Sequence, residues 1–111
     1  MFQDHSIFFY FGSFDYVKEN ILDSLREFSD VYILEYPFFS IEHARELQQK
    51  VSEHNVGKKK TYVLHISKIG IEAQHSLLKT CEEIHSDYSL IFCFQSGTDI
   101  LGTLLSRGVT Y

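Results

Sequence analysis

The 111-residue chain has few cysteines, no long apolar run and no excess of basic residues. Its two cysteines, Cys81 and Cys93, lie inside apolar segments, so we expect buried, free thiols in a reducing cytoplasm and no disulfide framework. The longest apolar run, Ile7 to Phe11, is far too short to span a bilayer, and the polar start of the chain does not resemble a secretory signal. We therefore expect a cytoplasmic protein without a membrane segment.

Charge excludes a second class of protein. The formal net charge is −5, which argues against a dedicated nucleic-acid binder, because such proteins gain affinity by neutralising phosphates with basic side chains. The single basic run is Lys58-Lys59-Lys60, directly before an apolar segment. We interpret this run as a solvated turn, with a phosphate contact as the alternative.

What the sequence does contain is a folded domain with alternating strands and helices. Apolar residues make up 44% of the chain, which excludes a disordered polymer, and its length fits one domain over residues 1–111. Apolar runs predict strands, and apolar residues spaced by three and four predict helices. Pro37 is expected in a loop, and Ser40 is expected to cap a helix. The expected strands are 7–11, 31–34, 62–66, 89–94 and 109–111; the expected helices are 14–28, 41–51, 73–84 and 100–105.

This alternation predicts the α/β class, with a parallel sheet between two layers of helices. Such a three-layer sandwich has more than one common strand order. Periodicity alone does not separate a P-loop-type order from a flavodoxin-type order.

Two motifs in the second half carry a family resemblance. The run EAQHSLLKTCEE occupies residues 72–83, and TLLSR occupies 103–107. They resemble the AAA+ modules of clamp-loader subunits, most closely the delta-prime subunit of bacterial DNA polymerase III, where the family writes A-x-N-A-L-L-K-T-L-E-E-P and then T-x-x-S-R-C. The resemblance covers about the last seventy residues well and the first forty loosely.

The resemblance implies a parallel five-stranded sheet of P-loop type with the first strand central, an AAA+ core without its lid domain. It implies a role in DNA replication through contacts with other clamp-loader or polymerase III subunits, and hence an indirect association with DNA.

The resemblance also places a phosphate-binding loop, G-x-x-x-x-G-K-[ST], directly after the first strand. Gly12 and Lys18 match this pattern, but Val17 replaces the second glycine and Glu19 replaces the hydroxyl residue. Such a loop curls backbone N–H groups around phosphate oxygens, which requires glycine where φ is positive. Glu19 offers no hydroxyl to Mg²⁺ and, like Asp15, adds negative charge. We therefore expect a degenerate loop that does not function as a nucleotide site.

The acidic pair that ends the third strand of active relatives falls at Leu64 and His65, so the carboxylates that position Mg²⁺ and water are missing. We expect no bound cofactor and no enzyme activity in the chain itself. As part of a polymerase III holoenzyme it would take part in that assembly's DNA-directed DNA polymerase activity.

Ser106 and Arg107 match the serine-arginine pair that delta-prime subunits place at a subunit boundary, with Gly108 in place of the cysteine. The resemblance implies that Arg107 is a trans-acting arginine finger, because a planar, permanently charged fork suits developing phosphoryl charge. The alternative is a cation that stabilises the C-terminus of an apolar helix.

Other sites are not expected. The four-cysteine zinc module of relatives is absent, no C-x-x-C occurs, and the histidines show no metal-ligand spacing; they are His5, His43, His54, His65, His75 and His85. Glu82 and Glu83 are interpreted as a solvated helix face.

Two other functions compete with a silent clamp-loader module. One is a divergent P-loop nucleotide-binding protein or NTPase that uses Gly12 and Lys18. The other, a receiver-like interaction domain, fits poorly because acidic residues do not cluster at the end of the first strand. Because the lid and collar domains are missing, we expect either a fragment or a reduced natural protein.

Overall fold

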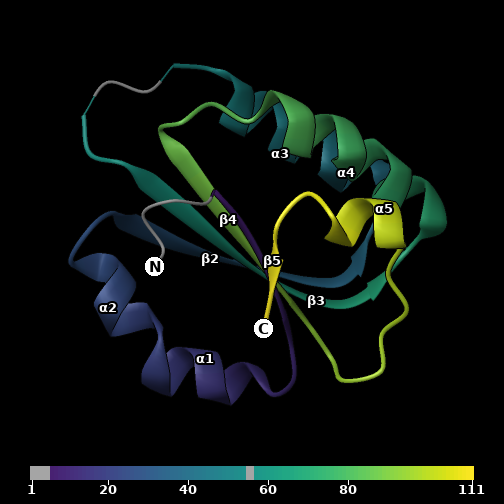
Figure 1. The fold of residues 1–111 in the computed structure, drawn as a ribbon, viewed down its shortest axis with the longest axis horizontal. Helices are drawn as coiled ribbons and strands as arrows, with labels where there is room; N and C mark the ends of the chain where they lie inside the picture. The colour runs from purple at the N-terminus through teal and green to yellow at the C-terminus, as the bar shows by residue number, and fades with distance from the viewer. Residues whose placement is uncertain (1–5, 55–56) are drawn as a thin grey trace.

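The computed structural model describes residues 6–54 and 57–111, which alternate strands and helices (Figure 1). His5 and Asn55, the start of the predicted basic turn, lie outside these ranges. The strands are β1 (Ile7–Phe11), β2 (Asp30–Phe39), β3 (Lys60–Ile69), β4 (Tyr88–Phe94) and β5 (Val109–Thr110). The helices are α1 (Phe14–Asn20), α2 (Leu22–Arg26), α3 (Ile41–Ser52), α4 (Ile71–Glu83) and α5 (Gly102–Leu105).

The five strands form one sheet in the order β2-β3-β4-β1-β5. Every pairing is parallel, which confirms the predicted α/β class. The first strand was expected at the centre of the sheet. It lies inside the sheet, between β4 and β5, but β4 holds the middle position.

Helices cover both faces of the sheet, which gives the expected three layers. Figure 1 shows α3, α4 and α5 on one side and α1 and α2 on the other. Neighbouring residues of a strand face opposite sides, and β4 is buried along its whole length. This double burial explains why the inner strands read as continuous apolar runs. The first layer packs on Phe9, Leu64 and Phe92, and the second on Phe8, Val63 and Ile91.

The helix predicted over residues 14–28 is instead two short helices, α1 and α2, which meet at Ile21. Phe28, the last residue of the predicted helix, lies beyond the end of α2 and is 60% exposed. The adjacent Ser29 is buried, and its hydroxyl bonds to the carbonyl of Leu25 and to the hydroxyl of Thr61 on β3. These bonds draw the chain out of α2 toward β2 and leave Phe28 on the outside.

Pro37 lies inside β2 and does not mark a loop, because β2 continues to Phe39. The strand is at the edge of the sheet, where a residue without an N–H group can point its nitrogen away from the neighbouring strand. The strand pairing accordingly passes over Pro37, from Tyr36 opposite Ile66 to Phe38 opposite Lys68.

Ser40 caps α3 as predicted. Its Oγ accepts from the His43 N–H at 3.4 Å, and the Ser40 N–H donates to His43 Nδ1 at 3.0 Å. This reciprocal pair closes the first turn. The helix buries Ala44, Leu47 and Val51 against the sheet, at the spacings of three and four from which a helix over 41–51 was predicted.

Within the described ranges, no helix is both long and apolar enough to cross a bilayer.

Candidate functional site

All five strands are parallel, so their carboxyl ends lie at one edge of the sheet, where parallel α/β folds usually bind ligands. A cleft of about 280 Å³ lies at this edge. Gly12 and Lys18, the two residues that matched the phosphate-loop pattern, both line it. The full lining is Gly12, Ser13, Phe14, Asp15, Lys18, Glu35, His65 and Gln95.

Gly12 makes the turn out of β1. Its φ of +155° is a backbone conformation that other residues rarely adopt. The glycine N–H already donates to the carbonyl of Phe94 at 2.9 Å, as a continuation of the sheet. It is therefore not directed into the cleft as a phosphate donor.

The segment that follows Gly12 is helical, not an open loop. Ser13 caps α1 and its Oγ accepts from the Asp15 N–H at 3.3 Å, while the Tyr16 N–H donates to the Ser13 carbonyl at 3.2 Å. Val17, at the position of the second glycine, is completely buried on the inner face of α1. The chain thus engages these N–H groups in its own turn.

An aromatic stack stands in the cleft. The rings of Phe14 and His65 are 4.2 Å apart between centroids and 9° from parallel. Lys18 Nζ lies 5.3 Å from the centre of the Phe14 ring, a cation–π distance. On the other side of the stack, Glu35 Oε1 lies 3.7 Å from His65 Nδ1. Side chains from α1, β3 and β2 therefore meet in this space.

Sequence reasoning found Gly12, Lys18 and His65 but missed Phe14 and Glu35 as cleft residues. Glu35 is directly opposite His65 in the pairing of β2 with β3. That neighbourhood depends on strand register, which spacing along the chain does not give. Leu64, the other position of the missing acidic pair, is fully buried in the core.

Ser106 and Arg107 follow α5 and do not line the cleft formed by the described residues. The Ser106 hydroxyl donates to the Thr103 carbonyl at 2.8 Å. Arg107 Nη2 lies 2.8 Å from Glu82 Oε1 on α4, and both side chains are about half exposed, at 44% and 50%. Glu82 comes 25 residues before Arg107 in the chain, so sequence proximity gave no sign of this ion pair.

The Glu82–Glu83 pair is exposed as predicted but is not simply solvated. Besides the bond from Glu82 to Arg107, Glu83 accepts from Gln48 Nε2 at 3.2 Å and lies 3.9 Å from Lys79 Nζ. The two adjacent acids thus tie α4 to α5 and to α3.

Both cysteines are free and buried, as expected. Burial raises the pKa of each thiol to about 12, and the nearby Arg107 guanidinium opposes this effect slightly for the pKa of Cys81. Neither thiol is therefore a ready nucleophile or metal ligand.

Two lysines of the basic run contact side chains of β2. Lys58 is exposed, with its Nζ 4.0 Å from Asp30 Oδ1, and Lys60 Nζ lies 5.9 Å from the centre of the Tyr32 ring. This agrees with a surface turn leading into β3.

One cluster of metal-ligating side chains occurs in the part of the chain that the structure describes: His54, His85 and Asp87. His54 lies between α3 and β3, and the other two lie between α4 and β4. Because both connections precede neighbouring parallel strands, they meet at the edge opposite the cleft. The expectation of no metal site looked at spacing within the chain and missed this juxtaposition, although the strand order would have placed the two connections together.

Comparison with known proteins supports the resemblance seen in the motifs. A family model described as DNA polymerase III, delta subunit, matches residues 19–111, so β1 and the turn at Gly12 precede the matched region. A search of curated proteins gave no match. Because the match spans most of the sequence and includes both motifs, the chain belongs to the DNA polymerase III delta subunit family.

Proposed function

We propose that this chain is an ATPase-inactive, delta-prime-like module with an AAA+ type core, acting through protein contacts in DNA replication. Membership of the DNA polymerase III delta subunit family supports a clamp-loader-related role and association with other subunits of that machinery. DNA would be reached through those partners. The position of β1 between β4 and β5 is consistent with the P-loop-type order that an AAA+ core requires.

The observation that carries the proposal is the content of the cleft beside Gly12. A phosphate site at this edge needs free backbone N–H groups and net positive charge. Here the N–H groups of Gly12, Asp15 and Tyr16 bond within the chain. The stacked rings of Phe14 and His65 occupy space that a nucleotide would need.

The charges that line the cleft also disfavour a bound phosphate group. Asp15 and Glu35 contribute carboxylates to the lining, whereas Lys18 contributes the lysine. The Lys18 ammonium lies over the Phe14 ring, so phosphate contact would require it to leave that ring. A triphosphate approaching this lining would meet more fixed negative than positive charge while His65 is neutral.

The proposed contribution to catalysis lies outside the cleft. We infer that Arg107 is presented to the ATP site of a neighbouring subunit, with Ser106 bracing the turn that carries it. The guanidinium is half exposed and already bonds a carboxylate. A phosphate group of a partner's nucleotide would compete with Glu82 for the same guanidinium N–H donors of Arg107.

Calorimetry with Mg²⁺ and ATP tests the silent site. We expect a dissociation constant of about 1 mM or weaker and no hydrolysis above background. Micromolar binding that is lost in Lys18→Ala would instead establish the alternative, a divergent P-loop nucleotide-binding protein. Tyr16→Ala is the matched control, because Tyr16 is an exposed residue of the same helix that does not line the cleft.

A second experiment tests the partner assignment. Immobilised chain should retain the ATPase subunits of a clamp loader from purified components, and the complex should withstand removal of ATP. Failure to retain any clamp-loader or polymerase III subunit, with a correctly folded chain, would contradict the proposed role.

A further inference from the structure

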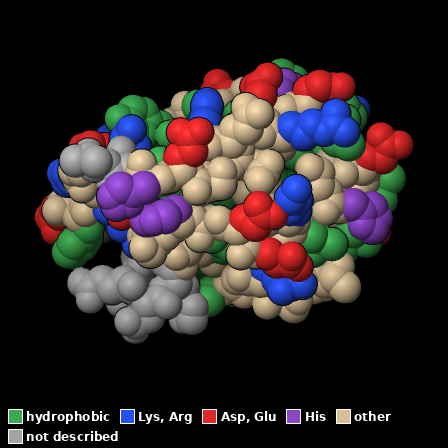
Figure 2. Space-filling view, turned by 90° about the horizontal axis from the view of Figure 1, so that it is seen from above, with side chains coloured by type: hydrophobic (Ala, Val, Ile, Leu, Met, Phe, Trp, Pro, Cys, Tyr) green, Lys and Arg blue, Asp and Glu red, His purple; other side chains and the backbone are tan. Residues whose placement is uncertain are grey.

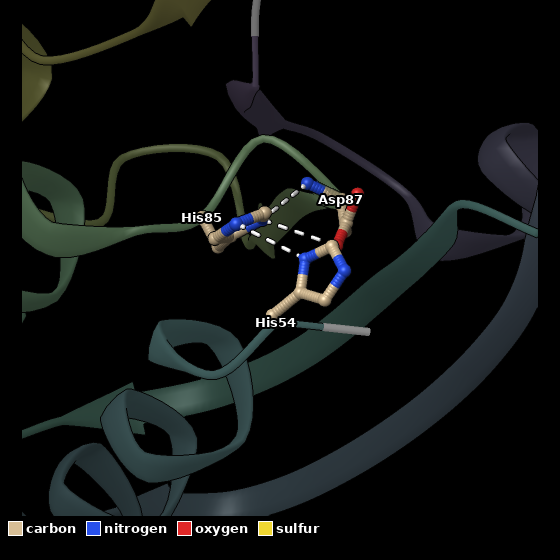
Figure 3. A network of polar contacts seen from close by, with 3 residues as sticks. All are labelled: His54, His85 and Asp87. Carbon is tan, nitrogen blue, oxygen red and sulfur yellow. Dashed lines mark hydrogen bonds and ion pairs between the residues drawn. The ribbon is translucent and has the colours of Figure 1, made fainter. Parts of the chain in front are cut away.

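We propose that His54, His85 and Asp87 form a binding site for a divalent transition-metal ion, with zinc as the best fit. Figure 3 shows the three side chains turned toward one another. One ligand atom from each residue lies within 4.8 Å of the others. The site is separate from the cleft and from Arg107, and the inference does not depend on the proposed function.

The two distances from His54 to the other ligand residues suit tetrahedral coordination. A zinc ion with bonds of 2.0–2.1 Å to nitrogen holds its ligand atoms roughly 3.3–3.4 Å apart, as the geometry of a tetrahedron requires. His54 Nδ1 lies 3.4 Å from His85 Nε2 and 3.1 Å from Asp87 Oδ2. Both separations are close to the edge length that an ion would impose.

The backbone holds two of the three ligands in place. The His85 N–H donates to the Val51 carbonyl at the end of α3, at 2.8 Å. The Asp87 carbonyl accepts from the Lys60 N–H at 2.9 Å, where β3 begins. Both residues also belong to one short connection, in which the Tyr88 N–H donates to the His85 carbonyl. The third ligand residue is His54. Its side chain is exposed and can rotate to complete the site.

Asp87 lies beside both imidazoles. Its Oδ2 lies 3.2 Å from His85 Nδ1. The Asp87 N–H donates to His85 Nδ1 at 3.1 Å, so this nitrogen acts as an acceptor. A metal ion on Nε2 requires the ring proton to be on Nδ1, so metal binding would break this bond.

The ligand set selects the metal class. Two imidazoles and a carboxylate suit zinc and its first-row neighbours, whereas magnesium and calcium prefer oxygen ligands alone. Surface histidines are present at this end of the molecule in the space-filling view (left side of Figure 2). The open side of the cluster leaves room for water as a further ligand. Bound metal would join the end of α3 to the connection between α4 and β4.

The test uses the full chain without an affinity tag, treated first with a chelator and then titrated with Zn²⁺ in a calorimeter. We expect one equivalent to bind. His54→Ala and Asp87→Asn each remove a ligand, so each should weaken binding by at least the roughly 10–100-fold that loss of an outer-shell partner costs. His75→Ala is the control, because His75 is exposed on α4 outside the cluster, and it should bind as the wild type does.

Two further readouts make the result decisive. Co²⁺ bound in place of Zn²⁺ should give the visible absorption of a tetrahedral nitrogen–oxygen site, and this band should disappear in His54→Ala. Zn²⁺ should also raise the melting temperature of the wild type but not of His54→Ala. The absence of one-to-one binding, or binding that is unchanged by His54→Ala and Asp87→Asn, would overturn the proposal. His54 is exposed, so His54→Ala should fold and can decide the matter alone if Asp87→Asn does not.

Discussion

At the scale of single residues, Arg107 combines an exposed position with a partner in its own chain. Its ion pair with Glu82 spans α4 and the end of α5. Exposed pairs of this kind contribute about 0–1 kcal/mol to folding. The pair is therefore better suited to holding the guanidinium in one place than to stabilising the fold.

Replacing Arg107 by Ala should remove most of a partner's ATP hydrolysis while leaving this chain stable. Loss of a trans-acting arginine costs on the order of 10³-fold or more in phosphoryl transfer. The measurement is the ATPase rate of a reconstituted assembly beside the melting temperature of the isolated variant. Glu82→Gln is the control and should retain hydrolysis, because it removes the local partner but keeps the guanidinium. A large fall in melting temperature with unchanged hydrolysis would make Arg107 a structural residue.

Cys81 and Cys93 should react with a thiol reagent only when the chain unfolds. Their thiols are buried, and burial raises their pKa values from 9.0 to about 12. Labelling in native buffer should therefore be slow, and labelling in denaturant should be fast, as followed by mass spectrometry. Rapid native labelling of either cysteine would show that its segment opens readily.

The same thiols should make the fold less stable at alkaline pH. Unfolded cysteines lose their protons as pH rises through the unperturbed pKa of 9.0, whereas the folded thiols keep theirs until about 12. Between these values the unfolded state binds fewer protons, so the free energy of unfolding falls as pH rises. Below the pKa of the unfolded thiols both states keep their protons, so the stability of the fold is not reduced by the two cysteines there. Urea denaturation of a Cys81→Ala, Cys93→Ala double variant should show a shallower alkaline decline than the wild type.

At the scale of elements, the sequence predicted most strands and helices but not their ends. Apolar composition located β1 and β4 because both are buried on two faces. The strand predicted for β2 ended early, at Leu34, because Pro37 indicates a break unless the strand is known to lie at an edge of the sheet. The prediction joined α1 and α2 because apolar spacing continues across Ile21, while the bonds of Ser29 that end α2 join residues far apart in the chain.

In the candidate site, too, some residues could be predicted from the sequence and others could not. Gly12 and Lys18 were identifiable because a motif fixes their spacing. The stack of Phe14 on His65, the pairing of Glu35 with His65, and the ion pair of Arg107 with Glu82 all connect separate elements. Such contacts follow from strand order and register, which local patterns do not specify.

Gly108 permits β5 to join the sheet. A Cβ at this position would lie 2.5 Å from the Ile7 carbonyl oxygen, a backbone atom that cannot turn aside. Gly108→Ala should therefore push β5 away from β1 and cost about 1–3 kcal/mol of stability, measured by urea denaturation. Gly102→Ala is the control, since nothing lies within 4 Å of its added Cβ and alanine favours the helix. Equal stability of the two variants would contradict this account of β5.

At the scale of the whole molecule, charge is negative overall and mixed in its distribution. Figure 2 shows acidic and basic side chains interspersed over one face, and the formal net charge is −5. The face shown there has no continuous basic stripe of the kind that tracks a phosphate backbone. This is consistent with contact to DNA through partners.

The isolated chain should accordingly bind duplex DNA very weakly. We expect a dissociation constant above about 10⁻⁴ M at physiological salt, the weak end of non-specific binding, measured by fluorescence anisotropy. Micromolar binding that weakens steeply with salt would contradict the expectation. If Lys58→Glu abolished such binding, the phosphate-contact interpretation of the basic run would replace that of a solvated turn.

The placement of β1 has a consequence for how the chain folds. The first strand pairs with β4 and β5, the last two: Ile7 lies opposite Leu90, and Phe8 lies opposite Val109. These contacts close nearly the whole chain into a loop, and such a high contact order slows folding. During synthesis the aromatic β1 segment leaves the ribosome before the other four strands and has no strand to join until β4 has emerged. Until then its apolar side chains stay accessible to chaperones and to other nascent chains.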